Sequence, residues 1–276
     1  MNVAGVELHV EGLQGDGAET IVMIHGWPDT HRLWDAQVEA LKGRYRCVRF
    51  TQPGFGRGSP RRAYTIDEIT AIYRQIVDAV SPGQPVILLL HDWGCVFGYE
   101  FYMRNQDRVS KIVGVDIGDP TSIRSSLTGR ELFGAFAYQY WLALAWIVGG
   151  RFGDWMTRVM SRTAKCPSDE QPMNSGMDWP YYTQWFGGAQ SFRKTVQRFM
   201  PACPMLFLYG RRKPVRFHAK SWADAVAAIP GNEVVPFETG HWVMLQEPAR
   251  FNEVVVRWLA QSGHNARPAT NSLEPA

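Results

Sequence analysis

The hydrophobic positions of this chain fall into short uninterrupted runs separated by longer amphipathic stretches. Such runs are typical of strands buried on both faces of a parallel sheet, and they predict strands at 21–24, 47–50, 86–90, 112–115, 205–209 and 234–237. The amphipathic stretches predict helices at 67–80, 97–104, 222–229 and 248–260. Strands that alternate with helices indicate an α/β fold, built on a mostly parallel, doubly wound sheet with right-handed crossovers.

The alternation stops between residues 120 and 200, which are rich in Trp, Tyr and Gly and are expected to be helical. An inserted helical cap of this kind would lie over the carboxyl ends of the strands, where open α/β sheets bind ligands. We therefore divide the chain into a core of residues 1–119 and 201–262, a cap of residues 120–200, and a small, polar tail of residues 263–276 that is expected to be disordered.

Within the predicted cap, residues 132–148 form a run without charge. A helix that spans a membrane needs about 20 apolar residues. This run is shorter, and Tyr138, Gln139 and Tyr140 interrupt its middle. We expect a buried or pocket-covering helix here, and no membrane span.

Composition narrows the class of protein. With 276 residues, 45% of them apolar, the chain can bury a large core, and its 11 Trp favour either an apolar pocket or a large aromatic core. The 29 basic and 26 acidic side chains leave a net charge of +3, which is too balanced to indicate nucleic acid as a partner. The first residues show no secretory signal, and the four Cys show no metal-ligand spacing. We expect a cytoplasmic protein with unpaired thiols and neither metal nor cofactor, as a monomer or a homodimer.

The candidate chemistry begins where the predicted strand at 86–90 runs into the sequence HDWG, residues 91–94, and then into a helix. This order matches a nucleophile elbow, with Asp92 in place of the usual Ser. A carboxylate that attacks a saturated carbon forms an alkyl ester, and water can cleave that ester at the carbonyl carbon of the Asp. Asp92 is therefore predicted to be a nucleophile that becomes alkylated; the alternative is an ordinary carboxylate that caps the following helix.

Two further loops supply partners for Asp92. The sequence HGWP follows the strand at 21–24, and this loop is expected to contribute one oxyanion-hole N–H, from Trp27, while Trp93 contributes the second. The sequence GHW follows the last predicted strand, where His241 can act as the general base for the hydrolytic water. An alternative for this histidine is a loop position without a role.

The substrate pocket is expected to be lined by His25, Pro28 and Trp141. For the side chain of His25 we favour a structural role in the turn.

A general base of this kind needs a carboxylate that fixes its tautomer. The stretch after the strand at 205–209 is GRRKP and holds no acid. The preceding strand ends in Asp116, which is therefore the predicted orienting acid, with Asp119 as the reserve. Either carboxylate could instead serve as a cap or a turn residue. A basic cluster follows the later strand and is expected to be a solvated surface; it consists of Arg211, Arg212, Lys213 and Arg216.

These motifs resemble those of the α/β-hydrolase superfamily, and more narrowly those of its epoxide hydrolase and haloalkane dehalogenase branch. The resemblance runs over residues 21–259 and is specific at HGWP, HDWG and GHW. It implies Asp92 as nucleophile, His241 as base and the two Trp N–H groups as oxyanion hole. The chain departs from the commonest epoxide hydrolase pattern at the orienting acid. In many dehalogenases that acid follows the earlier strand, as Asp116 does.

The leaving group separates epoxide chemistry from halide chemistry. A departing halide needs N–H donors and no proton, whereas an opening epoxide leaves a basic alkoxide that needs an acid. A Tyr, with a pKa of about 10, stays protonated at neutral pH and can donate. Epoxide hydrolases carry one ring-opening Tyr in each of two cap regions. By resemblance Tyr138 is the first and Tyr182 the second, with Tyr181 close behind, although each could instead belong to an aromatic core.

The sequence thus predicts a cofactor-free epoxide hydrolase that converts a small apolar epoxide and water into a vicinal diol. The alternative enzyme is a haloalkane or haloacid dehalogenase that uses the same Asp and His. A rival of another class is a hydrolase-fold ligand receptor without turnover.

Overall fold

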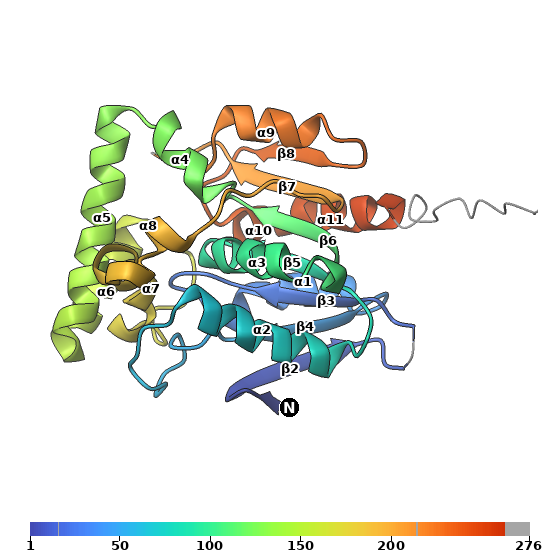
Figure 1. Cartoon of the computed structure of the whole chain (residues 1–276), viewed down its shortest axis with the longest axis horizontal. Helices are drawn as coiled ribbons and strands as arrows, with labels where there is room; N and C mark the ends of the chain where they lie inside the picture. The colour runs from blue at the N-terminus through green and yellow to red at the C-terminus, as the bar shows by residue number, and fades with distance from the viewer. Residues whose placement is uncertain (16, 214, 263–276) are drawn as a thin grey trace, which may run out of the picture.

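An eight-stranded sheet, ordered β1-β2-β4-β3-β5-β6-β7-β8, organises the chain (Figure 1). The computed structural model describes residues 1–15, 17–213 and 215–262, with the backbone alone at 124–126 and 262; the predicted disordered tail lies outside these residues. The strands are β1 (Asn2–Val3), β2 (Val6–Gly12), β3 (Thr20–Ile24), β4 (Arg46–Phe50), β5 (Val86–His91), β6 (Val109–Val115), β7 (Met205–Gly210) and β8 (Glu233–Phe237). β2 pairs antiparallel with both neighbours, and β4 to β8 run parallel.

All six predicted strands are present, and each is slightly longer than its apolar run. The central strands β3 and β5 are buried along their whole length, which is why their sequences are continuously apolar. The sequence analysis missed β2, near the edge of the sheet, where buried Val6 and Leu8 flank exposed Glu7. That alternation is the mark of a strand covered on one face, and a search for continuous runs overlooks it.

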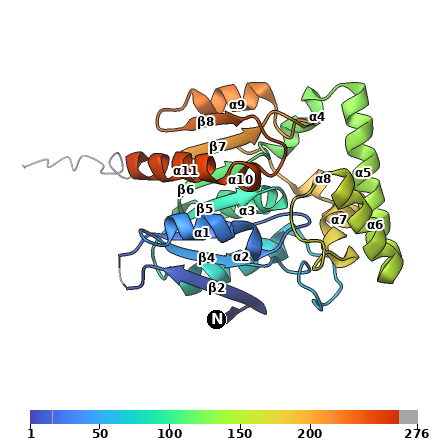
Figure 2. The same cartoon turned by 180° about the vertical axis from the view of Figure 1, so that it is seen from behind.

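Helices cover both faces of this sheet (Figure 2). They are α1 (Asp35–Leu41), α2 (Ile66–Val80), α3 (Trp93–Arg104), α9 (Lys220–Ala227), α10 (Val243–Gln246) and α11 (Pro248–Ser262). Buried side chains of α2, α3 and α9 belong to one hydrophobic cluster, and those of α1, α10 and α11 belong to a second. The four predicted helices are therefore confirmed, in a doubly wound α/β fold.

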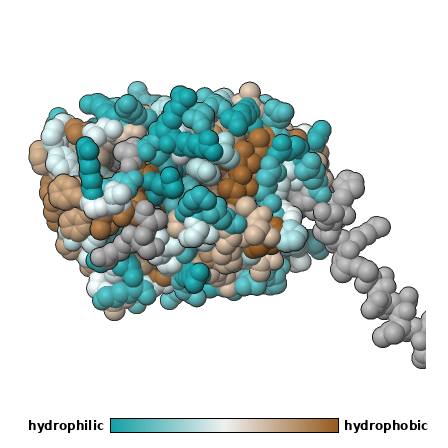
Figure 3. Space-filling model, turned by 90° about the horizontal axis from the view of Figure 1, so that it is seen from above, coloured by the Kyte–Doolittle hydropathy of each residue, from teal (hydrophilic) through white to brown (hydrophobic). Residues whose placement is uncertain are grey.

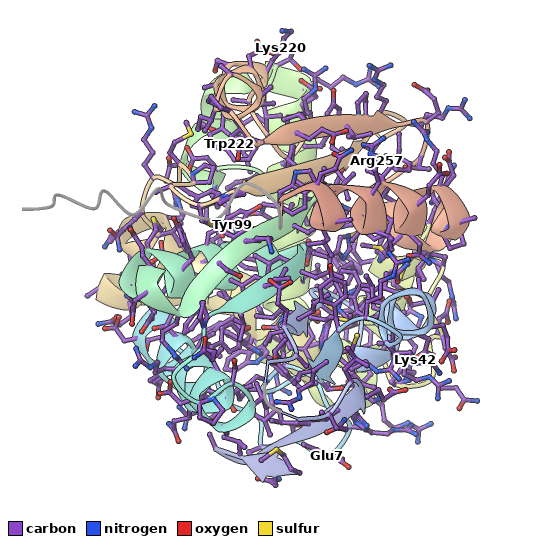
Figure 4. The ribbon with its side chains drawn as sticks, turned by 90° about the vertical axis from the view of Figure 1, so that its right-hand side faces the viewer. Glu7, Lys42, Tyr99, Lys220, Trp222 and Arg257 are labelled. Carbon is purple, nitrogen blue, oxygen red and sulfur yellow. The ribbon has the colours of Figure 1, made fainter. Side chains whose placement is uncertain are left out.

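Side chains in Figure 4 illustrate this division between core and surface. The labelled aromatic residues Tyr99 and Trp222 are buried in the first cluster. The labelled charged residues lie at the surface: Glu7, Lys220 and Arg257 are exposed, and Lys42 is half-buried. Short 3-10 segments complete the elements; they are η1 (His31–Trp34), η2 (Gln106–Arg108), η3 (Ser175–Asp178) and η4 (Gly188–Gln190).

Between β6 and β7 the chain leaves the sheet and forms a helical cap (Figure 1). Its helices are α4 (Pro120–Ser126), α5 (Gly129–Val148), α6 (Gly150–Thr163), α7 (Trp179–Phe186) and α8 (Phe192–Thr195). They lie beyond the carboxyl ends of the parallel strands, as a cap inserted at this point of the sheet must. Among the described residues, no helix has the length and apolarity needed to cross a membrane.

The uncharged run of the cap forms most of α5, which covers a cavity on one side. Of the two alternatives expected for this run, the pocket-covering helix is therefore the one found, and the other side of α5 borders solvent, where Phe133 is 74% exposed. One helix thus has apolar residues toward the cavity and toward solvent.

Candidate active site

Asp92 stands at a sharp bend between β5 and α3, with φ 54° and ψ −126°. A positive φ is uncommon for a residue with a side chain, and here the surrounding backbone imposes it. Gly94 lets α3 approach β3 closely, because a Cβ at this position would lie 2.2 Å from the carbonyl oxygen of Ile24. The HDWG sequence therefore forms the strand–turn–helix bend, and the bend directs the Asp92 carboxylate toward the cavity under the cap.

Hydrogen-bond donors hold both oxygens of this carboxylate. Its Oδ1 accepts from the backbone N–H of Trp27 at 2.7 Å, and the N–H of Trp93 also donates to the group. Its Oδ2 lies 3.3 Å from Nε2 of His241. Gly26 makes this approach possible, because a Cβ there would lie 2.3 Å from Oδ1. The two N–H groups expected to form an oxyanion hole thus both bond to the Asp92 carboxylate.

His241 is held from its other side by Asp116. Its Nδ1 lies 2.5 Å from Oδ2 of Asp116, which follows β6 with φ 70°. The structure therefore brings together the predicted nucleophile, base and orienting acid. Asp119 instead caps α4, accepting from the N–H of Thr121 at 3.1 Å, and this matches the alternative considered for it.

Lys213 corrects the expectation of a solvated basic cluster. Its ammonium group contacts Oδ1 of Asp116, and the side chain is 6% exposed. The N–H of Gly210 donates to the same oxygen at 3.0 Å. The loop after β7, where no acid occurs, thus contributes a cation that stabilises the acid after β6.

These contacts set the protonation of the site. Burial lowers the pKa of His241, but the hydrogen bonds and charges of Asp116 and Asp92 outweigh it and raise that pKa to about 9. Burial raises the pKa of Asp116, yet Lys213 and His241 hold it well below its ordinary range. The pKa of Asp92 is also lowered, because the His241 contacts outweigh burial. At neutral pH the site therefore holds an imidazolium between two carboxylates.

A cavity of about 890 Å³ lies between Asp92 and the cap. Most of its lining is apolar, with Val96, Ile117, Leu127, Phe136, Phe192 and Val215 among its residues. Tyr138 of α5 and Tyr181 of α7 also line it, with their ring centroids 5.9 Å apart. Burial, with a smaller contribution from the charge of Asp92, raises the pKa of both phenols, so both stay protonated at neutral pH.

Four residues expected at the pocket lie outside the cavity lining. The ring of Tyr182 stacks on Trp146 at 4.0 Å, so Tyr181 rather than Tyr182 faces the cavity. Trp141 donates its indole N–H to the carbonyl of Met156 and is held within the cap. The remaining two are Pro28 and His25.

His25 has the structural role that we favoured for its side chain. Its Nδ1 lies 2.8 Å from the Gly26 carbonyl, and its Nε2 accepts from the N–H of Gln52 at 2.9 Å. Burial lowers its pKa to about 4. A neutral ring with both nitrogens occupied holds the two loops together.

Two buried carboxylates beside the site escaped the sequence analysis. Asp178 of η3 accepts from the indole N–H of Trp27 at 2.7 Å and from the hydroxyl of Thr157 at 2.6 Å. Asp29 accepts from the indole N–H of Trp242 at 2.9 Å and from a cap hydroxyl, that of Ser168. Their hydrogen-bond partners are far away in sequence. The local sequence shows only an Asp beside a Trp, for Asp178, and an Asp beside a Pro, for Asp29, and neither pattern indicates a buried carboxylate.

No group of three or more His, Cys, Asp or Glu is arranged to hold a metal ion in the described part of the chain. All four Cys are unpaired, as expected.

A family model described as alpha/beta hydrolase fold matches residues 19–248. The chain belongs to this family. Among curated proteins, the Mycobacterium tuberculosis protein named "Probable oxidoreductase EphD" is 38% identical over 116 residues, which cover 40% of this chain and only 20% of that relative. Epoxide hydrolase A of the same organism is 24% identical, with 92% of this chain and 94% of the relative covered.

Solved α/β-hydrolase structures resemble the whole chain. An epoxide hydrolase from Bacillus megaterium in complex with an inhibitor superposes with a TM-score of 0.70, at 19% identity, covering 94% of this chain and 99% of that one. At this level of identity the likeness establishes a shared fold.

Proposed function

We propose that this α/β hydrolase is an epoxide hydrolase that opens apolar epoxides to vicinal diols. One arrangement carries the proposal: the Asp92 carboxylate and two protonated phenols, Tyr138 and Tyr181, line one largely apolar cavity. The epoxide hydrolases among the relatives support it. A carboxylate and a proton donor in one cavity are what the opening of a three-membered ether requires.

In the first step Asp92 attacks a ring carbon through Oδ2. The carbon–oxygen bond of the ring breaks, and its electron pair goes to the epoxide oxygen, which takes a proton from one of the two phenols. His241, protonated at neutral pH, restores that phenol through solvent. The products are a hydroxyalkyl ester on Asp92 and a neutral imidazole.

Ester formation also prepares the second step. The ester removes the negative charge of Asp92, one of the two charges that raise the pKa of His241, so that pKa falls and the neutral imidazole is favoured. His241 then takes a proton from water, and the hydroxide attacks the ester carbonyl. The N–H groups of Trp27 and Trp93 stabilise the oxyanion on Oδ1. Collapse breaks the bond between the carbonyl carbon and the original Oδ2, and the departing alkoxide takes the proton of the attacking hydroxyl. The diol leaves, and the carboxylate and the imidazolium are restored.

The hydrogen bond that the Trp27 indole already makes argues against the dehalogenase alternative. A departing halide needs side-chain N–H donors, and the indole of Trp27 stands where dehalogenases carry their second donor. Its N–H donates to Asp178 instead. Two phenols in the cavity, by contrast, offer the proton that an epoxide needs and a halide does not.

The test measures diol formation from terminal aromatic and aliphatic epoxides, with halide release from matched haloalkanes alongside. Replacing both phenols (Tyr138→Phe with Tyr181→Phe) should lower kcat for epoxides by about 10²-fold or more, the usual contribution of general acids. Tyr182→Phe is the matched control, because this ring stacks on Trp146 outside the cavity lining, and its rate should stay within twofold of the parent rate. Halide release that survives the double substitution would instead indicate a dehalogenase.

A single turnover in ¹⁸O-labelled water separates turnover from mere binding. The hydrolytic water attacks the ester carbonyl, so one ¹⁸O should appear in the Asp92 carboxylate, detected by mass spectrometry of the peptide. An unlabelled Asp92 would favour a ligand receptor without chemistry.

A further inference from the structure

The outer face of α5 is apolar over the length of the helix. Large hydrophobic side chains recur at intervals of three and four residues, which places them on one side of the helix. Two exposed aromatic residues of the adjoining α6 extend this surface. We call it the apolar cap face; it consists of Leu132, Phe133, Phe136, Leu144, Ile147, Val148, Phe152 and Trp155.

Such a surface is unusual for a helix that borders water. Surface helices carry polar residues on their outer side, and large exposed apolar patches mark interaction sites. Phe133 is 74% exposed and Phe152 is 60% exposed. Within the described part of the chain, Met1 and Leu13 are the exposed large hydrophobic residues that lie outside 132–200. Figure 3 shows brown side chains gathered at the left-hand end, where α5 lies in Figure 1.

Charge indicates what covers this face. Residues 120–200 contain nine Lys and Arg against five Asp and Glu, a net charge of +4, whereas the whole chain carries +3. The net positive charge therefore belongs to the cap, and the rest of the chain is slightly negative. Exposed Arg130 and Arg151 stand at the starts of α5 and α6, beside the apolar cap face. Two caps pressed together would repel each other, whereas an anionic surface would attract the cap.

The cavity reaches the same face. Leu132 and Phe136 are exposed and also line the cavity above Asp92, as do the basic residues Arg193 and Lys194. An apolar ligand dissolved in an apolar layer against this face could therefore enter the cavity without passing through water.

We propose that the apolar cap face docks onto an anionic lipid bilayer, with aromatic and aliphatic side chains in the interface and basic residues at the headgroups. Helices bind membrane surfaces in this way when an apolar face carries Phe, Trp and Leu beside Lys and Arg. Entry of substrate from the bilayer rests on the proposed function; the docking does not.

The experiment is co-sedimentation of the full chain with phosphatidylglycerol–phosphatidylcholine vesicles and with pure phosphatidylcholine vesicles. We expect binding to the anionic vesicles that weakens in high salt. The triple variant Phe133→Gln, Ile147→Gln and Phe152→Gln should reduce the partition coefficient at least tenfold. The pair Arg130→Gln and Arg151→Gln should reduce binding to anionic vesicles alone. Leu13→Gln, an exposed hydrophobic residue outside the cap, is the matched control and should bind as the parent does.

Circular dichroism and Tm verify that each variant is folded. The proposal is overturned when the parent stays in the supernatant with anionic vesicles, or when the triple variant binds as the parent does. Dimerisation that the triple variant abolishes, without vesicle binding, would identify a second copy of the chain as the occupant and would also overturn it. Vesicle binding without turnover of any epoxide would leave the docking intact and would count against the proposed function alone.

Discussion

At the scale of single residues, Asp116 shows how a charged acid is kept in the interior. Its carboxylate accepts a hydrogen bond from the N–H of Gly210. It also contacts the imidazole of His241 and the ammonium of Lys213. A buried carboxylate without such partners would become protonated and could no longer hold an imidazolium. Lys213 also explains why the acid can lie after β6, because the loop after β7 contributes the counter-charge.

Replacing Lys213 tests this pairing. Lys213→Met should lower the free energy of unfolding by about 3–5 kcal/mol, because it leaves a buried carboxylate short of a partner. Urea denaturation at neutral pH measures the change. Its neighbour Arg212 is 71% exposed and pairs with Glu238 at the surface, so Arg212→Met should cost less than about 1 kcal/mol. Equal losses from the two variants would contradict the buried pair.

At the scale of elements, the bend at Asp92 depends on how closely α3 approaches β3. Gly94 faces backbone oxygens of that strand, at a distance that leaves no room for a methyl group. Trp93, at the start of the same helix, donates its N–H to the Asp92 carboxylate. The position of the helix therefore also fixes one donor of the proposed oxyanion hole.

Adding a methyl group at two glycines should have opposite effects. Gly94→Ala should destabilise the fold by about 1–3 kcal/mol or more, because α3 must move away from β3. Gly134→Ala, inside α5 with open space around its Cβ position, should stabilise it by about 0.5–1 kcal/mol. Thermal unfolding of both variants provides the measurement. A Gly94→Ala variant with the stability and turnover of the parent would contradict the close approach of α3 to β3.

At the scale of the whole molecule, two buried carboxylates join the cap to the core. Asp178 of the cap holds the indole of Trp27, and Asp29 of the core holds a cap hydroxyl together with the indole of Trp242. Trp27 donates its backbone N–H to Asp92, and Trp242 adjoins His241. The cap is thereby tied to the loops that carry the proposed oxyanion N–H and the proposed general base.

The pH dependence of stability should reveal Asp29. Burial raises its pKa from about 3.8 to about 6, so its favourable contribution is complete below about pH 3.8 and disappears as the pH rises through about 6. Asp29→Asn lacks this titration. The stability advantage of the parent over the variant should therefore be larger near pH 4 than near pH 7, by up to about 3 kcal/mol.

Denaturant unfolding at the two pH values measures that difference. Asp67→Asn, at a side chain 83% exposed, is the control for the loss of one surface carboxylate. A parent-to-variant difference that grows with pH would show that Asp29 is ionised more readily than burial implies.

Local sequence determined the elements and the bend. Continuous apolarity follows from strands buried on both faces, and HDWG after such a run is the local signature of a strand–turn–helix bend, so β5, α3 and the place of Asp92 could be predicted. His241 and Asp116 could be placed because both follow parallel strands whose carboxyl ends meet at one edge. Their catalytic roles stay a proposal.

Tertiary packing decided which side chains of the cap and of the later loops face the site. Tyr181 and Tyr182 are neighbours on α7, about 100° apart around the helix, and only the packing of α7 turns one toward the cavity. In the sequence Lys213 cannot be distinguished from its exposed neighbours, because only the fold brings it into contact with Asp116. The partners of Asp178 likewise lie in other segments of the chain. Burial and pairing depend on what arrives from elsewhere in the chain, and no local pattern contains that information.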